Sequence, residues 1–167
     1  GGDAYRSILF HPKVEKWYCT NPPEVESDKI VPLPIGFEEP SRMGNNQRVL
    51  LDCLENAPPF SADSIFLPFH TPSTNASRQQ SINYLGSLPF VEIQGERQDL
   101  PEYLDSMGRH KFVICLEGSG PDTHRNYEAL LAGCIPIMKN STIKKVFELH
   151  NLPCVFVDFW QEIDDDF

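Results

Sequence analysis

The most constraining feature of this sequence is a regular alternation, from Ser64 onward, of strand-length apolar runs with polar stretches long enough to form helices. The apolar runs are SIFLPF (64–69), PFVEIQ (89–94), KFVICL (111–116), CIPIM (134–138) and CVFVDF (154–159). The run KFVICL is almost continuously apolar, which is typical of a strand buried on both faces. Strands that alternate with helices are joined by right-handed crossovers, so this pattern predicts a parallel sheet.

The stretches between these runs have features of helices. We expect helices over 75–85, 101–107, 123–132 and 141–150, and the start of a further helix within 160–167. Asp99 is a suitable N-cap for the second helix, because Glu102 follows it at the capping-box spacing. The buried face predicted for the fourth helix consists of Ile143, Val146, Phe147 and His150. The predicted fold class is therefore α/β, a Rossmann-like doubly wound parallel sheet of about five strands.

Residues 1–45 have a different character from the rest of the chain. They contain two short strand-like runs, 14–21 and 29–37, separated by the proline-rich PPEVESD, and a linker-like stretch follows at 38–48. This segment has too few apolar residues for a core of its own. We expect residues 1–45 to pack onto the sheet domain or to end a partner domain upstream, and residues 46–167 to form the Rossmann-like domain.

Charge and cysteine usage exclude several classes of function. The formal net charge of -10 argues against nucleic acid as the main partner, although well-placed cations could still hold a nucleotide. No apolar run is long enough for a membrane span. The five cysteines are far apart without a CxxC pair, so a zinc site or disulfide framework is not expected. Cys115, Cys134 and Cys154 lie in apolar runs and are predicted to be buried.

A glycine-rich turn, EGSGPDTHR, follows the run KFVICL. Ligands of open parallel sheets bind at the carboxyl ends of the strands, where this turn is expected to lie. Gly118, Ser119 and Gly120 would let backbone amides approach a phosphate closely, and Asp122 or Thr123 is a suitable cap for the next helix. A glycine turn of this kind is also common where a strand simply leads into a helix.

The helix after this turn carries an unusual pair of charges. Its predicted buried stripe consists of Tyr127, Leu130, Leu131 and Cys134. Arg125 and Glu128 lie beside each other on the flank of that stripe. An arginine near a helix N-terminus opposes the helix dipole, which suits a site for an anionic ligand, and Glu128 could accept hydrogen bonds from vicinal hydroxyls. An exposed Arg125–Glu128 ion pair explains the two residues equally well.

Three further residues at this edge are candidates for ligand contact. His124 is either a phosphate or sugar contact or a partly buried structural histidine. In the loop HTPSTNASR, Thr74, Asn75 and Arg78 could reach the same edge, although helix capping also accounts for the small polar residues. Glu117, Asp122 and Glu128 gather carboxylates there, but without a DxD pattern or a histidine pair we predict no metal site and no cofactor.

The run KFVICLEGSGPDTHRNYEALLAGCIPIM (111–138) resembles the donor-binding half of exostosin-like glycosyltransferases, which have the GT-B architecture. The stretches 66–78, 100–120, 11–23 and 29–37 are similar too, and the resemblance extends over about residues 11–160. The most specific element is DTHRNYEALLAGCIPI. The pair Glu117-Gly118 departs from the family, in which many members have proline and glycine.

The resemblance implies a domain that binds a UDP- or GDP-linked sugar and takes part in glycan biosynthesis, with transfer to a hydroxyl of a glycan acceptor and without a metal. It implies that Arg125 contacts the donor diphosphate, that Glu128 contacts ribose or sugar hydroxyls, and that the glycine turn approaches the phosphates. It identifies no general base. It leaves the Golgi lumen and the cytoplasm open as compartments, and a further domain would lie upstream.

Two other hypotheses remain at this point. One is a non-catalytic interaction or regulatory module that keeps the nucleotide-binding fold. The other is a flavodoxin-like or dinucleotide-binding protein, which is less well supported because the GxGxxG fingerprint is absent.

Overall fold

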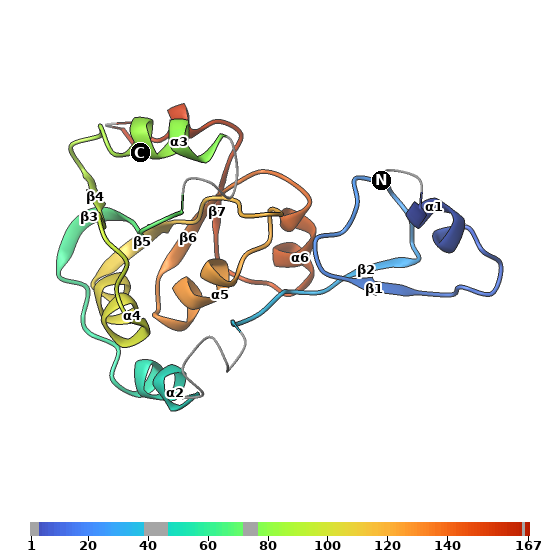
Figure 1. Ribbon diagram of the computed structural model, residues 1–167, viewed down its shortest axis with the longest axis horizontal. Coiled ribbons are helices and arrows are strands. Elements are labelled where there is room, and N and C mark those ends of the chain that lie inside the picture. Colours follow the sequence, from blue (N-terminus) through green and yellow to red (C-terminus); the bar gives the residue numbers. More distant parts are fainter. Residues whose placement is uncertain (1–3, 39–46, 72–76, 165) are drawn as a thin grey trace.

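The computed structural model describes residues 4–38, 47–71, 77–164 and 166–167, and its central element is a five-stranded parallel sheet (Figure 1). The strands are β3 (Ala62–Leu67), β4 (Val91–Ile93), β5 (His110–Ile114), β6 (Ile135–Lys139) and β7 (Val155–Val157). Their order across the sheet is β4-β3-β5-β6-β7. The predicted α/β, Rossmann-like fold class is therefore confirmed, and each strand overlaps the apolar run that predicted it.

Helices cover both faces of this sheet, as a doubly wound fold requires. The helices are α2 (Arg48–Glu55), α3 (Arg78–Leu85), α4 (Leu100–Gly108), α5 (His124–Leu131) and α6 (Ile143–Leu149). Side chains of α4, α5 and α6 share one hydrophobic cluster, and α2 packs against it through Cys53. The second cluster, on the opposite face, is shared by α3 and the C-terminal segment, which lie together in Figure 1.

Strand β5 and the two residues after it join the two clusters. Val113 and Cys115 point into the cluster beneath α4, α5 and α6, whereas Ile114 and Leu116 point into the one beneath α3. All four are almost completely buried. This alternation is the period of two expected of a strand, and it explains why KFVICL is apolar at successive positions rather than at every second one.

The path of the chain through the sheet reverses beside β5. From β3 the chain moves outward to the edge strand β4, and it then returns to the other side of β3 to form β5. The remaining strands continue in the new direction. Such a reversal leaves a crevice at the carboxyl ends of the two central strands, which is the usual ligand position in open parallel sheets.

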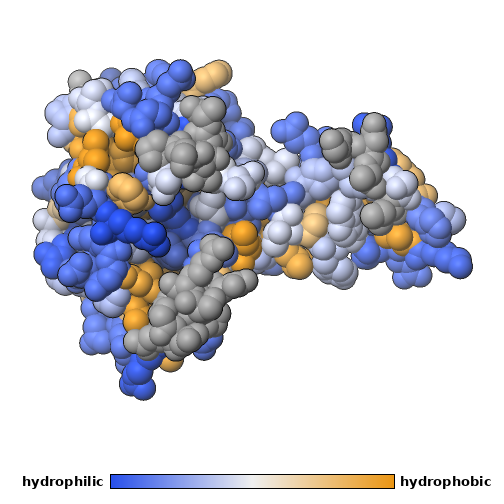
Figure 2. All heavy atoms as spheres, viewed as in Figure 1, coloured by the Kyte–Doolittle hydropathy of each residue, from blue (hydrophilic) through white to orange (hydrophobic). Residues whose placement is uncertain are grey.

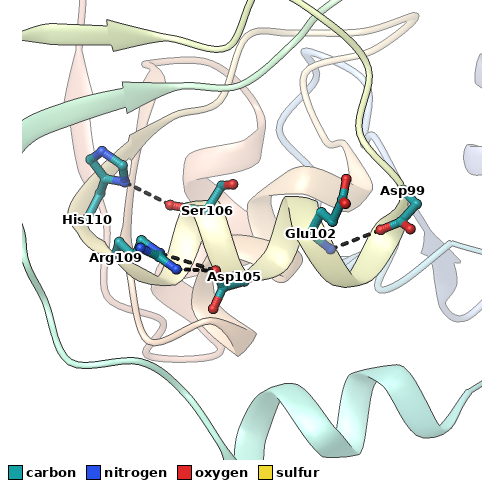
Figure 3. A network of polar contacts seen from close by, with 6 residues as sticks. All are labelled: Asp99, Glu102, Asp105, Ser106, Arg109 and His110. Carbon is teal, nitrogen blue, oxygen red and sulfur yellow. Dashed lines mark hydrogen bonds and ion pairs between the residues drawn. The ribbon is translucent and has the colours of Figure 1, made fainter.

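Helix α4 begins and ends with side-chain hydrogen bonds (Figure 3). The Asp99 carboxylate accepts a hydrogen bond of 3.0 Å from the backbone amide of Glu102, which confirms Asp99 as the predicted N-cap. At the other end, Arg109 donates to Asp105 at 2.8 Å and His110 Nδ1 lies 2.9 Å from the Ser106 carbonyl. The helix position is therefore fixed at both ends.

Helix α5 ends in a Schellman motif, which explains the sequence AGC at its C-terminus. Gly133 has a φ of +81°, its amide donates to the Leu130 carbonyl, and the Cys134 amide donates to the Ala129 carbonyl. The residues that this helix buries are Asn126, Tyr127 and Ala129. Leu130 and Leu131 of the predicted stripe are only half-buried, although Leu130 still packs against the hydrophobic cluster. The chain turns from this motif directly into β6.

Two other predictions of burial or structure need correction. His150 is exposed, because α6 ends at Leu149 and the chain turns away from the core. The helix expected within 160–167 is a short 3-10 turn at Trp160–Glu162. The Glu162 carboxylate accepts from the amides of Asp158 and Phe159 and so stabilises the start of the turn. The turn ends at Ile163, where the extended backbone sends that side chain into the core.

The N-terminal residues form an arm that extends from the sheet domain (Figure 1). The arm contains α1 (Ala4–Leu9), β1 (Trp17–Cys19) and β2 (Ile30–Pro32), and the two strands pair in parallel as a separate two-stranded sheet. Both strands were predicted from the sequence, but α1 was not. The predicted boundary between residues 45 and 46 lies outside the described residues.

The arm is attached to the sheet domain by hydrogen bonds to Asp122, at the start of α5. The Asn21 side chain accepts from the Asp122 amide at 2.8 Å, and the Asp122 carboxylate accepts from the Ile35 amide at 2.8 Å. The same carboxylate accepts from the Tyr127 hydroxyl at 2.9 Å and from the Asn126 amide group at 3.3 Å. A buried carboxylate that accepts from three donors is a strong anchor.

The surface and the cysteines agree only in part with the predictions. On the face shown in Figure 2, hydrophobic residues form small separate patches on a largely hydrophilic surface. No helix within the described ranges is long and apolar enough to cross a membrane. All five cysteines are free thiols; Cys115 and Cys134 are buried as predicted, whereas Cys154 is only partly buried.

We predict that replacing Asp122 with asparagine loosens the arm and lowers the free energy of unfolding by about 1–3 kcal/mol, because an amide NH₂ group would then face donors that now have an acceptor. Urea unfolding measures the change in stability, and trypsin cleavage at Lys29 measures release of the arm. The exposed Asp63→Asn variant is the control. Equal stability and equal cleavage rates for the two variants would show that Asp122 is not an anchor.

Candidate functional site

A cavity of about 1060 Å³ lies at the carboxyl ends of β3 and β5. Its wall comes from the segment after β3, the turn before α5, the first half of α5, the loop between β4 and α4, and the N-terminal segment. This is the crevice that the reversal of the strand order predicts. Its volume is slightly above the range of about 300–1000 Å³ that is usual for small-molecule sites.

Eight of the ten residues predicted from sequence to contact a ligand line this one cavity. They are Arg78, Gly118, Ser119, Gly120, Asp122, His124, Arg125 and Glu128. The other two, Thr74 and Asn75, lie outside the described residues. The fold thus brings together residues that are up to 50 positions apart in the chain (128 − 78), although several of them have bonding roles that the sequence did not reveal.

Arg125 reaches from α5 toward the end of β3. Its Nε donates to the Tyr103 hydroxyl at 3.2 Å and its Nη2 donates to the Phe69 carbonyl at 3.1 Å. These two bonds fix the plane of the guanidinium group. Its Nη1 makes no hydrogen bond within the described part of the chain, so donors remain for a ligand in the cavity.

Glu128 lies one turn further along α5. Its Oε2 accepts from the Tyr103 hydroxyl at 3.1 Å, while its Oε1 makes no hydrogen bond to any described residue. Burial raises the pKa of this carboxyl, and the Arg125 charge and the bond from Tyr103 act in the opposite direction. The alternative of an exposed Arg125–Glu128 pair is wrong, because both side chains are partly buried and the phenol of Tyr103 bonds to each of them.

Arg78 is the second cation of the cavity and is 7% exposed. Its Nη1 donates to the Thr71 carbonyl at 3.1 Å, and its Nε and Nη2 donate to the Glu117 carbonyl. The guanidinium therefore joins the segment after β3 to the segment after β5. Burial and the nearby Arg125 charge lower the pKa of Arg78, which indicates that the two guanidinium groups repel each other.

His70 was not anticipated from the sequence and is 4% exposed. Its Nδ1 lies 2.5 Å from the Pro68 carbonyl, and because a carbonyl only accepts, Nδ1 carries the proton. Its Nε2 has no hydrogen-bond partner among the described residues. Burial, together with the charges of Arg125 and Arg78, lowers the pKa of His70 to about 2, so the ring is neutral beside the two arginines.

The glycine turn is packed against the protein itself. A Cβ atom on Gly120 would lie 2.5 Å from the Asn21 side-chain oxygen, and the Gly118 amide donates to the Gly120 carbonyl at 3.0 Å. Gly120 is therefore required by the close approach of the N-terminal segment. The amides of Ser119 and Gly120 donate no hydrogen bond within the described part of the chain and remain available at the cavity wall.

Asp122 and His124 both contact the N-terminal segment. Of the two predicted caps, Thr123 occupies the N-cap position of α5 without a side-chain capping bond, and the Asp122 carboxylate instead accepts from Ile35, Asn126 and Tyr127. His124 Nδ1 lies 2.7 Å from the Gly36 carbonyl, and its Nε2 lies 3.6 Å from the Glu38 carboxylate. These two candidates thus hold the arm at the edge of the cavity.

The part of the cavity wall toward β4 and α4 combines amide and apolar groups with the charged side chains of Arg97 and Asp99. Gln94 accepts from the Phe69 amide at 3.1 Å and donates to the Gln98 side chain at 2.6 Å. Leu100 and Pro101 lie beside them at the start of α4. The two glutamines of this part of the wall were not predicted from the sequence, because neither belongs to a recognisable motif. Arg97 is exposed on the same loop.

No group of three or more histidine, cysteine, aspartate or glutamate side chains in the described ranges is arranged to hold a metal ion. Glu117, Asp122 and Glu128 are therefore not brought together as metal ligands. The expectation of a site without a metal stays a prediction.

No known family model matches this sequence, and no curated protein matches it either. The chemistry of the cavity therefore has to be inferred from its own residues.

We predict that His70 makes the fold sensitive to acid. The unfolded chain binds a proton near pH 6.5, whereas folded His70 does so only near pH 2, so stability is full above pH 6.5 and is lost as the pH falls. His70→Asn keeps a donor for the Pro68 carbonyl but cannot titrate. As the pH falls from 6.5 to 4.5, the unfolding free energy of the His70→Asn variant should decrease less steeply than that of the wild type. The two slopes should differ by about 1.4 kcal/mol per pH unit.

Urea unfolding over this pH range measures the difference. The exposed His150→Asn variant is the matched control and should follow the wild-type pH dependence. Parallel curves for His70→Asn and the wild type would contradict the assignment of a neutral, buried His70.

Proposed function

We propose that this chain binds a nucleotide-diphosphate sugar and acts as the donor-binding domain of a glycosyltransferase. The observation that carries the proposal is the position of Arg78 and Arg125, two neighbouring guanidinium groups that line one cavity at the carboxyl edge of a parallel sheet. Carbonyl groups orient both of them, from Thr71 and Glu117 for Arg78 and from Phe69 for Arg125.

The two cations, of which Arg125 is partly offset by Glu128, favour a ligand that carries negative charges. A diphosphate supplies these charges and offers several oxygens to the remaining N–H groups of Arg125. The Ser119 and Gly120 amides at the cavity wall can add hydrogen bonds, as backbone amides do at many phosphate sites. The neutral state of His70 keeps a third positive charge away from this region.

Other parts of the cavity suit the remaining groups of such a ligand. The Oε1 atom of Glu128 is an acceptor for hydroxyl groups of a ribose or a transferred sugar. The end formed by Phe69, Gln94 and Leu100 combines apolar surface with an amide, which suits a planar nucleobase. A nucleotide-diphosphate sugar has these three parts in one molecule.

For the chemical step, the residues available here act on the leaving group. Transfer breaks the bond between the sugar and the diphosphate, and the negative charge that develops on the diphosphate is stabilised by Arg78 and Arg125. This permits transfer without a metal ion. The group that removes the proton from the acceptor hydroxyl is not assigned. The resemblance to exostosin-like glycosyltransferases over residues 111–138 suggests a glycan hydroxyl as acceptor.

We predict that UDP or GDP raises the melting temperature of the protein and that Arg125→Ala abolishes most of this effect. Loss of a charge-assisted hydrogen bond costs about 1.5–3 kcal/mol, so the dissociation constant should rise at least about tenfold. Isothermal titration calorimetry with UDP, GDP and their sugars measures the affinity. Arg109→Ala, which removes an exposed arginine paired with Asp105, is the control and should bind like the wild type.

Two outcomes would redirect the proposal. If no nucleotide binds at millimolar concentration, the donor-site assignment is wrong. If a nucleotide binds but neither hydrolysis nor transfer of a nucleotide-linked sugar is detected with the full-length gene product, the chain is a non-catalytic module that keeps the fold.

A further inference from the structure

Tyr103, on α4, lies between the two charged groups of α5 that line the cavity. Its hydroxyl is 3.2 Å from Arg125 Nε and 3.1 Å from Glu128 Oε2. An arginine only donates hydrogen bonds and a carboxylate only accepts them, so the directions are fixed: the phenol accepts from Arg125 and donates to Glu128. With these two bonds the hydroxyl has used its proton and one lone pair.

The tyrosine itself is held from outside the cavity. Its ring packs against the hydrophobic cluster beneath α4, α5 and α6, and its backbone amide donates to the carbonyl of Asp99, the N-cap of α4. Helix α4 is fixed at its other end by the bonds of Arg109 and His110 (Figure 3). The hydroxyl is therefore presented to Arg125 and Glu128 by a rigid element.

This arrangement changes what the two charges can do. Residues three apart on a helix are neighbours, and an arginine and a glutamate at that spacing readily form an ion pair. In such a pair the carboxylate oxygens of Glu128 would accept hydrogen bonds from Arg125. Fewer donors of Arg125 and fewer acceptors of Glu128 would then remain for a ligand. In this structure the phenol takes one donor and one acceptor, so Arg125 keeps its Nη1 donors and Glu128 keeps its Oε1 acceptor.

We propose that Tyr103 is a positioning residue, which holds Arg125 and Glu128 apart so that the first meets the diphosphate and the second meets the sugar hydroxyls of the same ligand. The inference rests on the proposed function. The inference goes beyond the proposed function because it assigns the separation of Arg125 and Glu128 to Tyr103, a residue on another helix.

The pH dependence of nucleotide binding separates this role from simple packing. Binding of hydroxyl groups needs Glu128 as a carboxylate, and the hydrogen bond from Tyr103 helps to keep its pKa from rising further. Loss of that bond should move the acid limb of binding to higher pH. Four titratable or charged groups influence the pKa of Glu128, namely Arg125, Tyr103, His124 and Glu38. Glu128 in turn helps to raise the pKa of Cys115.

The test is the variant Tyr103→Phe, which removes the hydroxyl and keeps the ring. Calorimetric titration with UDP and GDP from pH 5 to pH 8 should show about tenfold weaker binding at neutral pH and an acid limb at higher pH than in the wild type. Tyr84→Phe is the matched control, because its hydroxyl bonds the Ile163 carbonyl at the other face of the sheet. It should bind as the wild type does at every pH.

A double-mutant cycle with Glu128→Gln tests whether Tyr103 acts through Glu128. The two changes should be clearly non-additive in binding, and Tyr103→Phe should no longer move the acid limb once Glu128 is glutamine. Additive effects, or a Tyr103→Phe variant that behaves like Tyr84→Phe, would overturn the positioning role while leaving nucleotide binding in place. Absence of nucleotide binding by the wild type would instead overturn the proposed function and this inference with it.

A second substitution keeps the test valid if Tyr103→Phe does not fold. Site-specific 3-fluorotyrosine at position 103 preserves the shape of the side chain and makes the phenol a stronger donor. The acid limb should then move to lower pH, opposite to the change expected for phenylalanine. An unchanged acid limb would count against a hydrogen bond that tunes Glu128.

Discussion

The structure depends on the burial of β5 and the two residues after it on both faces of the sheet. The side chains on both faces of this segment are almost fully buried, Val113 and Cys115 on one face and Ile114 and Leu116 on the other. The segment therefore has to lie inside a sheet that is covered by helices on both faces. The chain changes direction beside this strand, and the glycine turn and α5 begin where the buried segment ends. The position of the cavity is therefore a consequence of the strand order, and the polar residues that line it are placed there by the most apolar part of the chain.

The electrostatics of the cavity follow from the way its charges are held. Arg78 and Arg125 are oriented by backbone carbonyls, which cannot neutralise a charge; the two guanidinium groups repel each other, and Glu128 offsets part of the charge of Arg125. The carboxylate of Asp122 is engaged in holding the arm, and Glu128 is separated from Arg125 by the hydroxyl of Tyr103. An anionic ligand would relieve this repulsion, which is the physical reason for linking the site to a diphosphate.

Much of the fold was predictable from the sequence because it depends on local periodicity. The strand-length apolar runs, the cap at Asp99 and the four helices between strands were all predicted within a few residues of their observed positions. The candidate site was predictable only as a set of residues at one edge, because strand order brings Arg78 and Arg125 together and no local pattern reports that. Tyr103, His70 and Gln94 were missed for the same reason: each matters through a partner far away in sequence. Gly120 and Asp122 were predicted as parts of a phosphate-binding turn and a helix cap. The sequence did not show that Asn21 contacts both of them, because Asn21 is far away in the chain.

The stretch that most resembles a known family, DTHRNYEALLAGCIPI, divides into parts with different physical functions. Its second half shapes the scaffold, since Gly133 ends α5 in a Schellman motif and the residues after it enter a buried strand. Its first half has two functions within about two helical turns: Asp122 and His124 hold the N-terminal segment, and Arg125 and Glu128 keep free atoms for a ligand in the cavity that all four residues line. Because these residues follow one another at the start of α5, a change in the anchoring of the arm is expected to move the arginine as well. A substitution of Asp122 or His124 that loosens the arm is therefore also a substitution in the binding site, because both residues line the cavity.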